Sequence, residues 1–163
     1  MILIALGSNL SSHAGNPHDT LRAALAHLGD NGVTPVEVSR FYRTPAWPDP
    51  RDPEFVNAVA RVATELSPKD LIARLHETET AFGRARSTQN APRTLDLDIL
   101  DYDGRVETGP PVLPHPRLAG RAFVLVPLRD VAPAWRHPVS RKSVAELLAE
   151  IPQADRGAVV PAD

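Results

Sequence analysis

Asn90-Ala-Pro-Arg-Thr-Leu-Asp-Leu-Asp-Ile-Leu100 is the segment from which the rest of the sequence can be interpreted. From residue 94 to residue 99 polar and apolar residues alternate, which predicts a strand with Asp96 and Asp98 on one face and a core-facing side on the other. Two carboxylates at this spacing stand roughly 6 to 7 Å apart. Mg²⁺ binds one or two carboxylates and completes its shell with water and phosphate oxygens. The segment therefore predicts a magnesium site that accepts a nucleotide.

A second interpretation of this strand is an ordinary half-buried antiparallel strand that shows its acids to solvent without a metal. The flanking residues favour the nucleotide site. Arg84, Arg86 and Arg93 lie within a dozen positions of the acid pair, in a segment that contains Pro92 and has no apolar period. Guanidinium groups match phosphate oxygens in a planar fork. A basic loop beside two acids therefore indicates a polyphosphate clamp.

The composition is that of one globular domain over residues 1–163, of which 42% are hydrophobic. The absence of cysteine excludes a disulfide framework and a thiolate zinc site. A net charge of -2 and a pI near 6.3 argue against a surface that binds nucleic acid. No apolar run reaches membrane-spanning length, and the apolar N-terminal run is too short for a signal sequence. We expect a cytoplasmic monomer whose partners are small molecules, with no nucleic acid and no membrane.

Local patterns predict the element order β-α-β-β-α-β. Asn16-Pro17 and Ser67-Pro68 mark two helix starts, because a capping side chain there precedes a first-turn proline. The expected elements are, in order, a strand over 2–6, a helix over 17–28, strands over 33–44 and 55–66, a helix over 68–82 and the diacid strand over 94–100. This order is typical of a ferredoxin-like α+β fold, in which an antiparallel sheet has both helices on one face. We expect ligands on the open face.

Beyond the diacid strand the sequence predicts additional C-terminal elements. Asp103-Gly104 is typical of a hairpin turn that leads to a short return strand around Val106. A capping box that begins at Ser143 predicts a last helix that ends near Ile151. Residues 158–163 have the composition of a frayed tail.

A long loop is expected between the second and third strands. Residues 45–53 contain four prolines, two aspartates, an arginine and Trp47, a composition that no regular element would use. Two interpretations of Trp47 stay open: a packing residue over the base of its own loop, or a ligand contact. Loops of this length in compact domains are often functional lids.

Seven motifs, spread over nearly the whole chain, resemble those of one enzyme family. In chain order they are Gly7-Ser-Asn-Leu10, Phe41-Tyr-Arg-Thr-Pro45, Phe55-Val-Asn57, Gly83-Arg-Ala-Arg86, Pro92-Arg-Thr-Leu-Asp-Leu-Asp-Ile99, Pro114-His115 and Arg121-Ala-Phe-Val-Leu-Val-Pro-Leu128. With this spacing the chain resembles 6-hydroxymethyl-7,8-dihydropterin pyrophosphokinase. That folate-biosynthesis family transfers the β,γ-diphosphate of ATP to the hydroxymethyl group of a reduced pterin and releases AMP.

The resemblance implies a catalytic group and a nucleotide site. Asp96 and Asp98 would hold two Mg²⁺ that bridge the phosphates of ATP, and Arg84 and Arg93 would act with them in catalysis. On the ATP side the matching residues are Glu79, Arg84, Arg86, Arg93, His115 and Arg121. No protein nucleophile is needed, because displacement at phosphorus mainly requires alignment of the reactants and stabilisation of charge.

The resemblance also implies a pterin site. Phe55 and Phe123 would sandwich the flat ring, and Asn57 would hydrogen-bond its amide edge. The other pterin-side positions are Asp96 and the main-chain groups of Thr44, Pro45, Ala46 and Trp47.

Three positions depart from the family's pattern. Asn90 stands where some members have Trp, in a loop that is one residue shorter, so a stacking contribution there is not expected. Phe55 keeps the ring of a Tyr that also occurs at this position and loses its hydroxyl. Pro116 replaces an aromatic residue that some members have beside the histidine. None of these changes touches the acid pair or the principal arginines.

Two functions of other classes use the same fold. A nucleic-acid-binding module would need stacking aromatics on the central strands and a basic surface, whereas this chain has aspartates there and a negative net charge. A regulatory module that binds a small ligand without catalysis would have no use for two acids beside three arginines. Mg²⁺-dependent formation of AMP from ATP, only when the reduced pterin is present, separates the three hypotheses.

Overall fold

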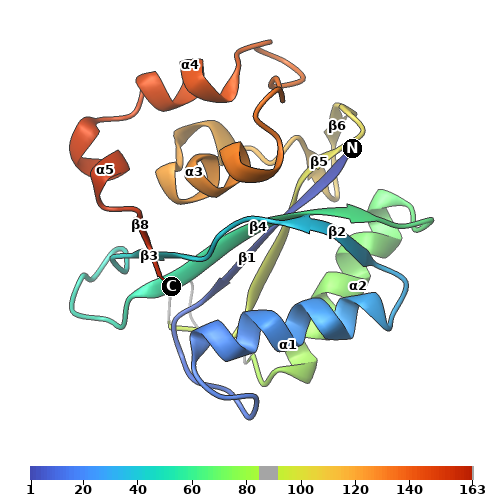
Figure 1. Ribbon diagram of the computed structural model, residues 1–163. Coiled ribbons are helices and arrows are strands. Elements are labelled where there is room, and N and C mark those ends of the chain that lie inside the picture. Colours follow the sequence, from blue (N-terminus) through green and yellow to red (C-terminus); the bar gives the residue numbers. More distant parts are fainter. Residues whose placement is uncertain (85–91, 163) are drawn as a thin grey trace.

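The computed structural model describes residues 1–84 and 92–162, and at its centre is an antiparallel sheet with helices on both faces (Figure 1). The strands are β1 (Ile2–Ser8), β2 (Thr34–Val38), β3 (Tyr42–Thr44), β4 (Phe55–Ala63), β5 (Asp96–Tyr102), β6 (Glu107–Thr108), β7 (Val112–Leu113) and β8 (Val160–Pro161). The helices are α1 (Pro17–Gly29), α2 (Pro68–Ala81), α3 (Ala122–Val131), α4 (Val144–Ala149) and α5 (Gln153–Gly157), with a 3-10 turn at Leu118–Gly120. No helix in the described part of the chain is long and apolar enough to cross a membrane.

The main sheet has the strand order β5-β1-β4-β3-β8, and β2 also pairs with β4. Two short strands, β2 and β3, therefore replace the single strand expected over 33–44. The interruption falls at Ser39, whose backbone N–H donates to the Val59 carbonyl (2.9 Å) while its hydroxyl accepts from the Val59 N–H (3.0 Å). A side chain thus takes the place of a backbone acceptor in the ladder, which an alternating pattern cannot reveal.

The two helices expected from their caps are confirmed, and both cover the same face of the sheet. The Asn16 side chain accepts from the Asp19 N–H (2.9 Å), and the Ser67 hydroxyl accepts from the Asp70 N–H (3.2 Å). Both helices bury an apolar stripe, α1 mainly against β1, β2 and β4, and α2 mainly against β5. The fully buried residues of this first core include Ile4, Leu21, Leu28, Leu71, Leu75 and Leu95.

The opposite face of the sheet was expected to be open, and this expectation is wrong. A second core lies there, in which α3 packs between the sheet and α4 (Figure 1). Residues 122–128 are almost entirely apolar because this helix is buried on most sides, Leu125 and Leu128 completely. The part of the face that α3 leaves uncovered lies at the N-terminal end of this helix, beside the start of β5.

Two expectations for the C-terminal half need correction. The turn at Asp103-Gly104 is present, but the strand that follows it, β6, pairs with β7 and not with β5. Residues 158–163 are not a frayed tail as far as they are described, because β8 pairs with β3 and the Ala162 N–H donates to the Phe41 carbonyl (2.8 Å). The expected helix after Ser143 is α4, with the predicted capping box at Ser143 and Glu146, but it is not the last one, because α5 follows it.

Candidate active site

The two aspartates of the diacid strand lie side by side on the face that also holds α3. Leu97 and Ile99 between and after them are buried in the first core, so the alternation predicted from the sequence is confirmed. The side chains of Asp96 and Asp98 are 31% and 39% exposed. This partial exposure at the edge of a core leaves both carboxylates accessible to a ligand.

Small residues on the neighbouring strand β1 form the floor beside the acid pair. Gly7 lies between Asn57 on β4 and Asp96 on β5, and Ala5 pairs with Asp98. A Cβ at position 7 would lie 2.8 Å from Asn57 Oδ1, so no larger residue fits without displacing that amide. Ala5 and Gly7 were not among the predicted site residues, although small residues at alternate positions of an otherwise Ile- and Leu-rich strand are a visible pattern.

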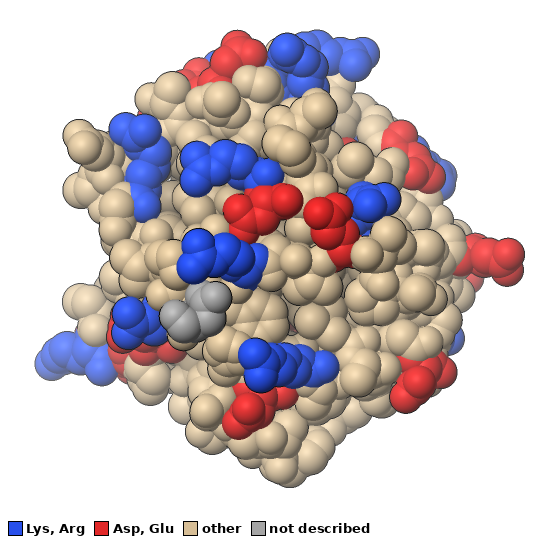
Figure 2. All heavy atoms as spheres, in the orientation of Figure 1, with Lys and Arg blue, Asp and Glu red and all other residues tan. Residues whose placement is uncertain are grey.

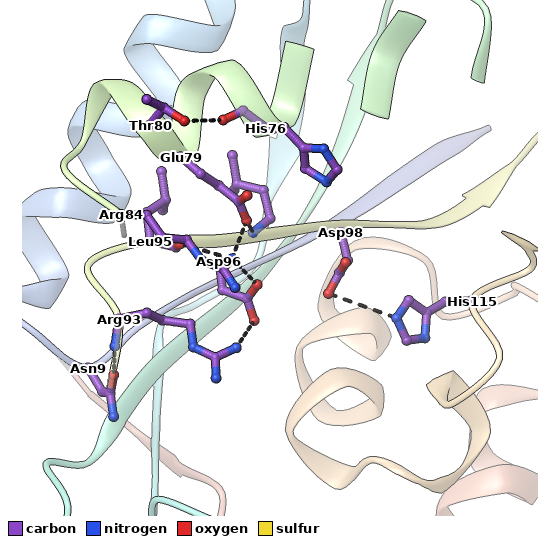
Figure 3. A network of polar contacts seen from close by, with 11 residues as sticks. Asn9, His76, Glu79, Thr80, Arg84, Arg93, Leu95, Asp96, Asp98 and His115 are labelled. Carbon is purple, nitrogen blue, oxygen red and sulfur yellow. Dashed lines mark hydrogen bonds and ion pairs between the residues drawn. The ribbon is translucent and has the colours of Figure 1, made fainter. Parts of the chain in front are cut away.

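Asp96 is held between two arginines from opposite ends of the basic loop (Figure 3). Arg84 Nη1 lies 2.8 Å from Asp96 Oδ1, and Arg93 Nη1 lies 3.3 Å from Asp96 Oδ2. Burial acts against the charge of Arg84, but Glu79 and Asp96 outweigh it and raise the pKa of this guanidinium. Arg84 is therefore fixed as a cation at the edge of the acid pair. The third arginine of this loop, Arg86, lies outside the described residues, as does Asn90.

Glu79 on α2 contacts Arg84 from the interior of the protein and is only 1% exposed. One carboxylate oxygen accepts from Arg84 Nη1 (2.6 Å) and from the backbone N–H of Leu97 (2.8 Å). The carboxylate thus ties α2 to β5 and to the arginine. Its contacts are those of a group that positions Arg84.

Asn9 connects the two loops that border the site. Its side-chain oxygen accepts from the Arg93 N–H (2.7 Å), and its amide nitrogen donates to the Pro53 carbonyl (3.2 Å). The residue is 3% exposed. The turn after β1 therefore fixes the end of the basic loop relative to the end of the proline-rich loop.

Asp98 points toward His115 (Figure 3), and the charge of Arg121 also acts on its carboxylate. His115 Nε2 lies 3.8 Å from Asp98 Oδ2, an ion-pair distance. Burial, and then the neighbouring Asp96, raise the pKa of Asp98. Burial lowers the pKa of His115 despite Asp98, and it lowers the pKa of Arg121 as well. The carboxylates of Asp96 and Asp98 are like charges in a partly buried position, so a bound cation would stabilise them.

An aromatic cleft with a cavity volume of about 160 Å³ adjoins the acid pair. It is lined by Thr44, Pro45, Trp47, Phe55, Asn57, Arg93, Asp96, Arg121 and Phe123. Arg93 lies over the Phe55 ring (6.0 Å from Cζ to the centroid) and Arg121 over the Phe123 ring (5.4 Å). Trp47 is 71% exposed, so its interpretation as a packing residue over its own loop is wrong.

The structure thus brings most of the predicted residues into one region. A second, smaller hollow shares Asn57, Asp96, Arg121 and Phe123 with the cleft and adds Asp98 and His115. Ala46 lines neither hollow in the described structure and is buried. Asn57 is fixed from β3, because its amide donates to the Thr44 hydroxyl (2.8 Å).

The charges on this side of the molecule are mixed, with acidic atoms near the centre and basic side chains around them (Figure 2). Within the described residues no three His, Cys, Asp or Glu side chains gather into a metal site. Asp96 and Asp98 remain the candidate ligands for a metal. Two hard carboxylates with room beside them suit Mg²⁺, which takes its remaining ligands from water and phosphate.

Comparison with known proteins gives consistent matches along the chain. A family model described as 7,8-dihydro-6-hydroxymethylpterin-pyrophosphokinase matches residues 3–133. The chain is 40% identical over 155 residues to a 2-amino-4-hydroxy-6-hydroxymethyldihydropteridine pyrophosphokinase of Pseudomonas aeruginosa, covering 93% of this chain and 91% of that protein. It is 37% identical over 151 residues to the protein of the same name from Synechocystis sp., covering 91% and 75%.

Longer proteins contain a similar region. The folic acid synthesis protein fol1 of Pneumocystis carinii is 33% identical over 98% of this chain, which spans 21% of fol1. The crystal structure of wild-type Plasmodium falciparum HPPK-DHPS superimposes with a TM-score of 0.66 at 14% identity, over 91% of this chain and 44% of that one. That likeness shows the fold alone. The family model and the relatives that match at nearly full length show that the chain belongs to the 7,8-dihydro-6-hydroxymethylpterin-pyrophosphokinase family.

Proposed function

We propose that this pyrophosphokinase transfers the diphosphate of ATP to the hydroxymethyl group of 6-hydroxymethyl-7,8-dihydropterin, with the reacting groups meeting at Asp96 and Asp98. The observation that supports this assignment is the position of the acid pair. Asp96 lines both the aromatic cleft and the smaller hollow that contains Asp98 and His115. A ligand in the cleft and a ligand in the smaller hollow would therefore meet at this residue.

In this proposal the aromatic cleft binds the pterin. Phe55 and Phe123 stack on its ring, and Asn57, already oriented by Thr44, bonds its amide edge. The main-chain groups of residues 44–47 complete the contacts. Trp47, exposed beside the cleft, is available to cover the ring once it is bound.

The arginines bind and orient the triphosphate of ATP. Arg84 and Arg93 stabilise the charge that builds up on the transferred group, and Arg121 and His115 hold the nucleotide from the side of Asp98. Glu79 acts through Arg84, and Arg86 adds a further contact. Bound Mg²⁺, two ions in our proposal, would be held by Asp96 and Asp98 and would neutralise phosphate charge next to the attacking hydroxyl.

This function is accompanied by proposals for the topology, the domain bounds, the oligomeric state and the location of the protein. The order β1-α1-β2-β3-β4-α2-β5, with β2 and β3 both paired with β4 and β1 lying between β4 and β5, supports a ferredoxin-like topology, extended on its second face by α3 to α5. We also propose a single pyrophosphokinase domain over 1–163, a monomer and a cytoplasmic location. A non-catalytic nucleic-acid-binding or regulatory module is not favoured, because the family match is to an enzyme.

The direct test measures AMP release from ATP with and without Mg²⁺ and the reduced pterin. We expect turnover only when all three components are present. Asp96→Ala and Asp98→Ala should each reduce kcat by at least the roughly 10²- to 10³-fold that follows loss of one group that stabilises transition-state charge. Asp103→Ala is the matched control, because Asp103 follows the same strand but contacts the N-terminal amine (3.0 Å). Near-normal turnover in either site variant would contradict the assignment.

A further inference from the structure

We propose that Tyr42 and Asp130 form a positioning pair for the pterin: their hydrogen bond fixes α3 on β3 and thereby sets the separation between the two aromatic walls, Phe55 and Phe123. The inference rests on the proposed function, because it concerns the cleft assigned to the pterin. Neither residue lines that cleft, so the pair acts through the elements that it joins.

The contact links residues that are 88 positions apart in the sequence. The Tyr42 hydroxyl donates to Asp130 Oδ2 (2.7 Å), and the Arg40 N–H donates to the same oxygen (3.2 Å). Tyr42 is 5% exposed and belongs to the second core. Burial, and then the carboxylate of Asp130, raise the pKa of Tyr42 to about 12. The phenol therefore stays a donor at every pH at which the enzyme would work.

Each partner is rigidly connected to one wall of the cleft. Tyr42 pairs with Asn57 on β4, and Thr44, two residues further along β3, pairs with Phe55. Asp130 lies seven residues after Phe123 on α3, which is about two helical turns and so nearly the same side of the helix. A shift at the Asp130 end of α3 would therefore move Phe123 relative to Phe55.

The opposite edge of the sheet holds the same end of α3 through a second contact. Trp135, just beyond the helix, donates through Nε1 to Asp101 on β5 (2.8 Å), and both residues are buried. Loss of the Tyr42 contact would therefore let α3 tilt toward β5 without detaching. If this tilt moved Phe123 away from Phe55 by about 0.5–1 Å, each dispersion contact with a ring stacked between them would lose a quarter to a half of its energy.

The experiment compares dissociation constants for the pterin and for an ATP analogue by titration calorimetry, together with kcat. Tyr42→Phe and Asp130→Ala should each weaken pterin binding about three- to tenfold, the range spanned by one aromatic stacking contact. ATP affinity and kcat should change less than about twofold. The double variant should bind the pterin no worse than Asp130→Ala alone, because the bond that Tyr42→Phe removes is already lost in Asp130→Ala. Asp130→Asn, which keeps an acceptor oxygen, should bind the pterin nearly as the wild type does.

Tyr102→Phe is the matched control for a general loss of stability. Tyr102 is also a buried tyrosine of the sheet, and its hydroxyl donates to the Leu66 carbonyl on the other face, away from the cleft. Tyr102→Phe should lower the stability about as much as Tyr42→Phe does, but it should leave the pterin affinity unchanged. Unchanged pterin affinity in Tyr42→Phe and Asp130→Ala, additive effects in the double variant, or equal weakening in Tyr102→Phe would overturn the inference.

Phe123→Ala separates this inference from the proposed function. If Phe123→Ala weakens pterin binding and the Tyr42 and Asp130 variants do not, the pterin site stands and the positioning role is wrong. If Phe123→Ala also binds the pterin normally, the assignment of the aromatic cleft itself is wrong.

Discussion

Glu79 has a different task from the other acids of the site. Asp96 and Asp98 are partly exposed and can bind a ligand. Glu79 is buried, and one of its oxygens accepts hydrogen bonds from Arg84 and from the backbone N–H of Leu97 on β5. A buried ion pair is strongly destabilising to break, because the remaining charge keeps its desolvation cost without compensation. The residue therefore contributes both to the stability of the protein and to the placement of an arginine.

Glu79→Gln should therefore lower stability and turnover together. Removal of one partner of a buried pair costs about 3–5 kcal/mol, and we expect a value near the lower end, because glutamine keeps an oxygen that accepts from Leu97. Urea unfolding gives the stability and AMP release gives kcat. Glu77→Gln on the same helix is the control, since Glu77 has a 72% exposed side chain and a loose pair with Arg74 (3.4 Å). A Glu79 variant as stable and as active as the wild type would contradict this role.

Among the elements, the three-residue strand β3 connects the cleft to α3 and to the C-terminal segment. It carries Tyr42 and Thr44, which connect to α3 and to Asn57, and it is bordered by β4 on one side and β8 on the other. Pairing on both sides gives this short strand the hydrogen bonds that its length would otherwise not supply. The C-terminal segment is thus part of the support of the cleft.

Deletion of residues 159–163 should destabilise the protein by about 1–2 kcal/mol, since a net hydrogen bond contributes about 0.5–1.5 kcal/mol and Val159 packs against the second core. Chemical denaturation measures the change. Val160→Thr keeps the backbone pairing with Arg43 and should stay within about 0.5 kcal/mol of the wild type. Equal stability of the deleted and complete chains would show that β8 does not support β3.

At the scale of the whole molecule, one sheet separates two cores that differ in their role. The first core, under α1 and α2, holds the sheet together, while the second core, under α3 and α4, also holds one wall of the cleft. Because every central strand contributes to both cores, neither can melt without exposing the other. We therefore expect a single cooperative unfolding transition.

Leu21→Ala and Leu125→Ala test this arrangement, one in each core and both fully buried. Each should cost about 2–5 kcal/mol through lost contacts and the cavity left behind. Only Leu125→Ala, two residues from Phe123, should also weaken pterin binding. Tryptophan fluorescence and far-ultraviolet circular dichroism should report the same midpoint in both variants, and separate midpoints would show that the two cores unfold independently.

The sequence by itself determined the features that depend on near neighbours. The caps at Asn16 and Ser67 and the alternation around Asp96 and Asp98 involve side chains within four residues of one another, so their structural meaning is present in the local order. The family motifs likewise predicted Arg84, Arg93, Phe55 and Phe123 as site residues, because a motif is a local pattern of residues.

Only the tertiary structure decided the features that depend on residues far apart in the chain. The break at Ser39 requires Val59, the burial of Glu79 requires Arg84 and Leu97, and the anchoring of α3 requires Tyr42 to meet Asp130. The covering of the second face and the pairing of β8 arise in the same way. Their energy comes from packing and hydrogen bonds between distant segments, and these partners become neighbours only when the sheet and its two cores have formed.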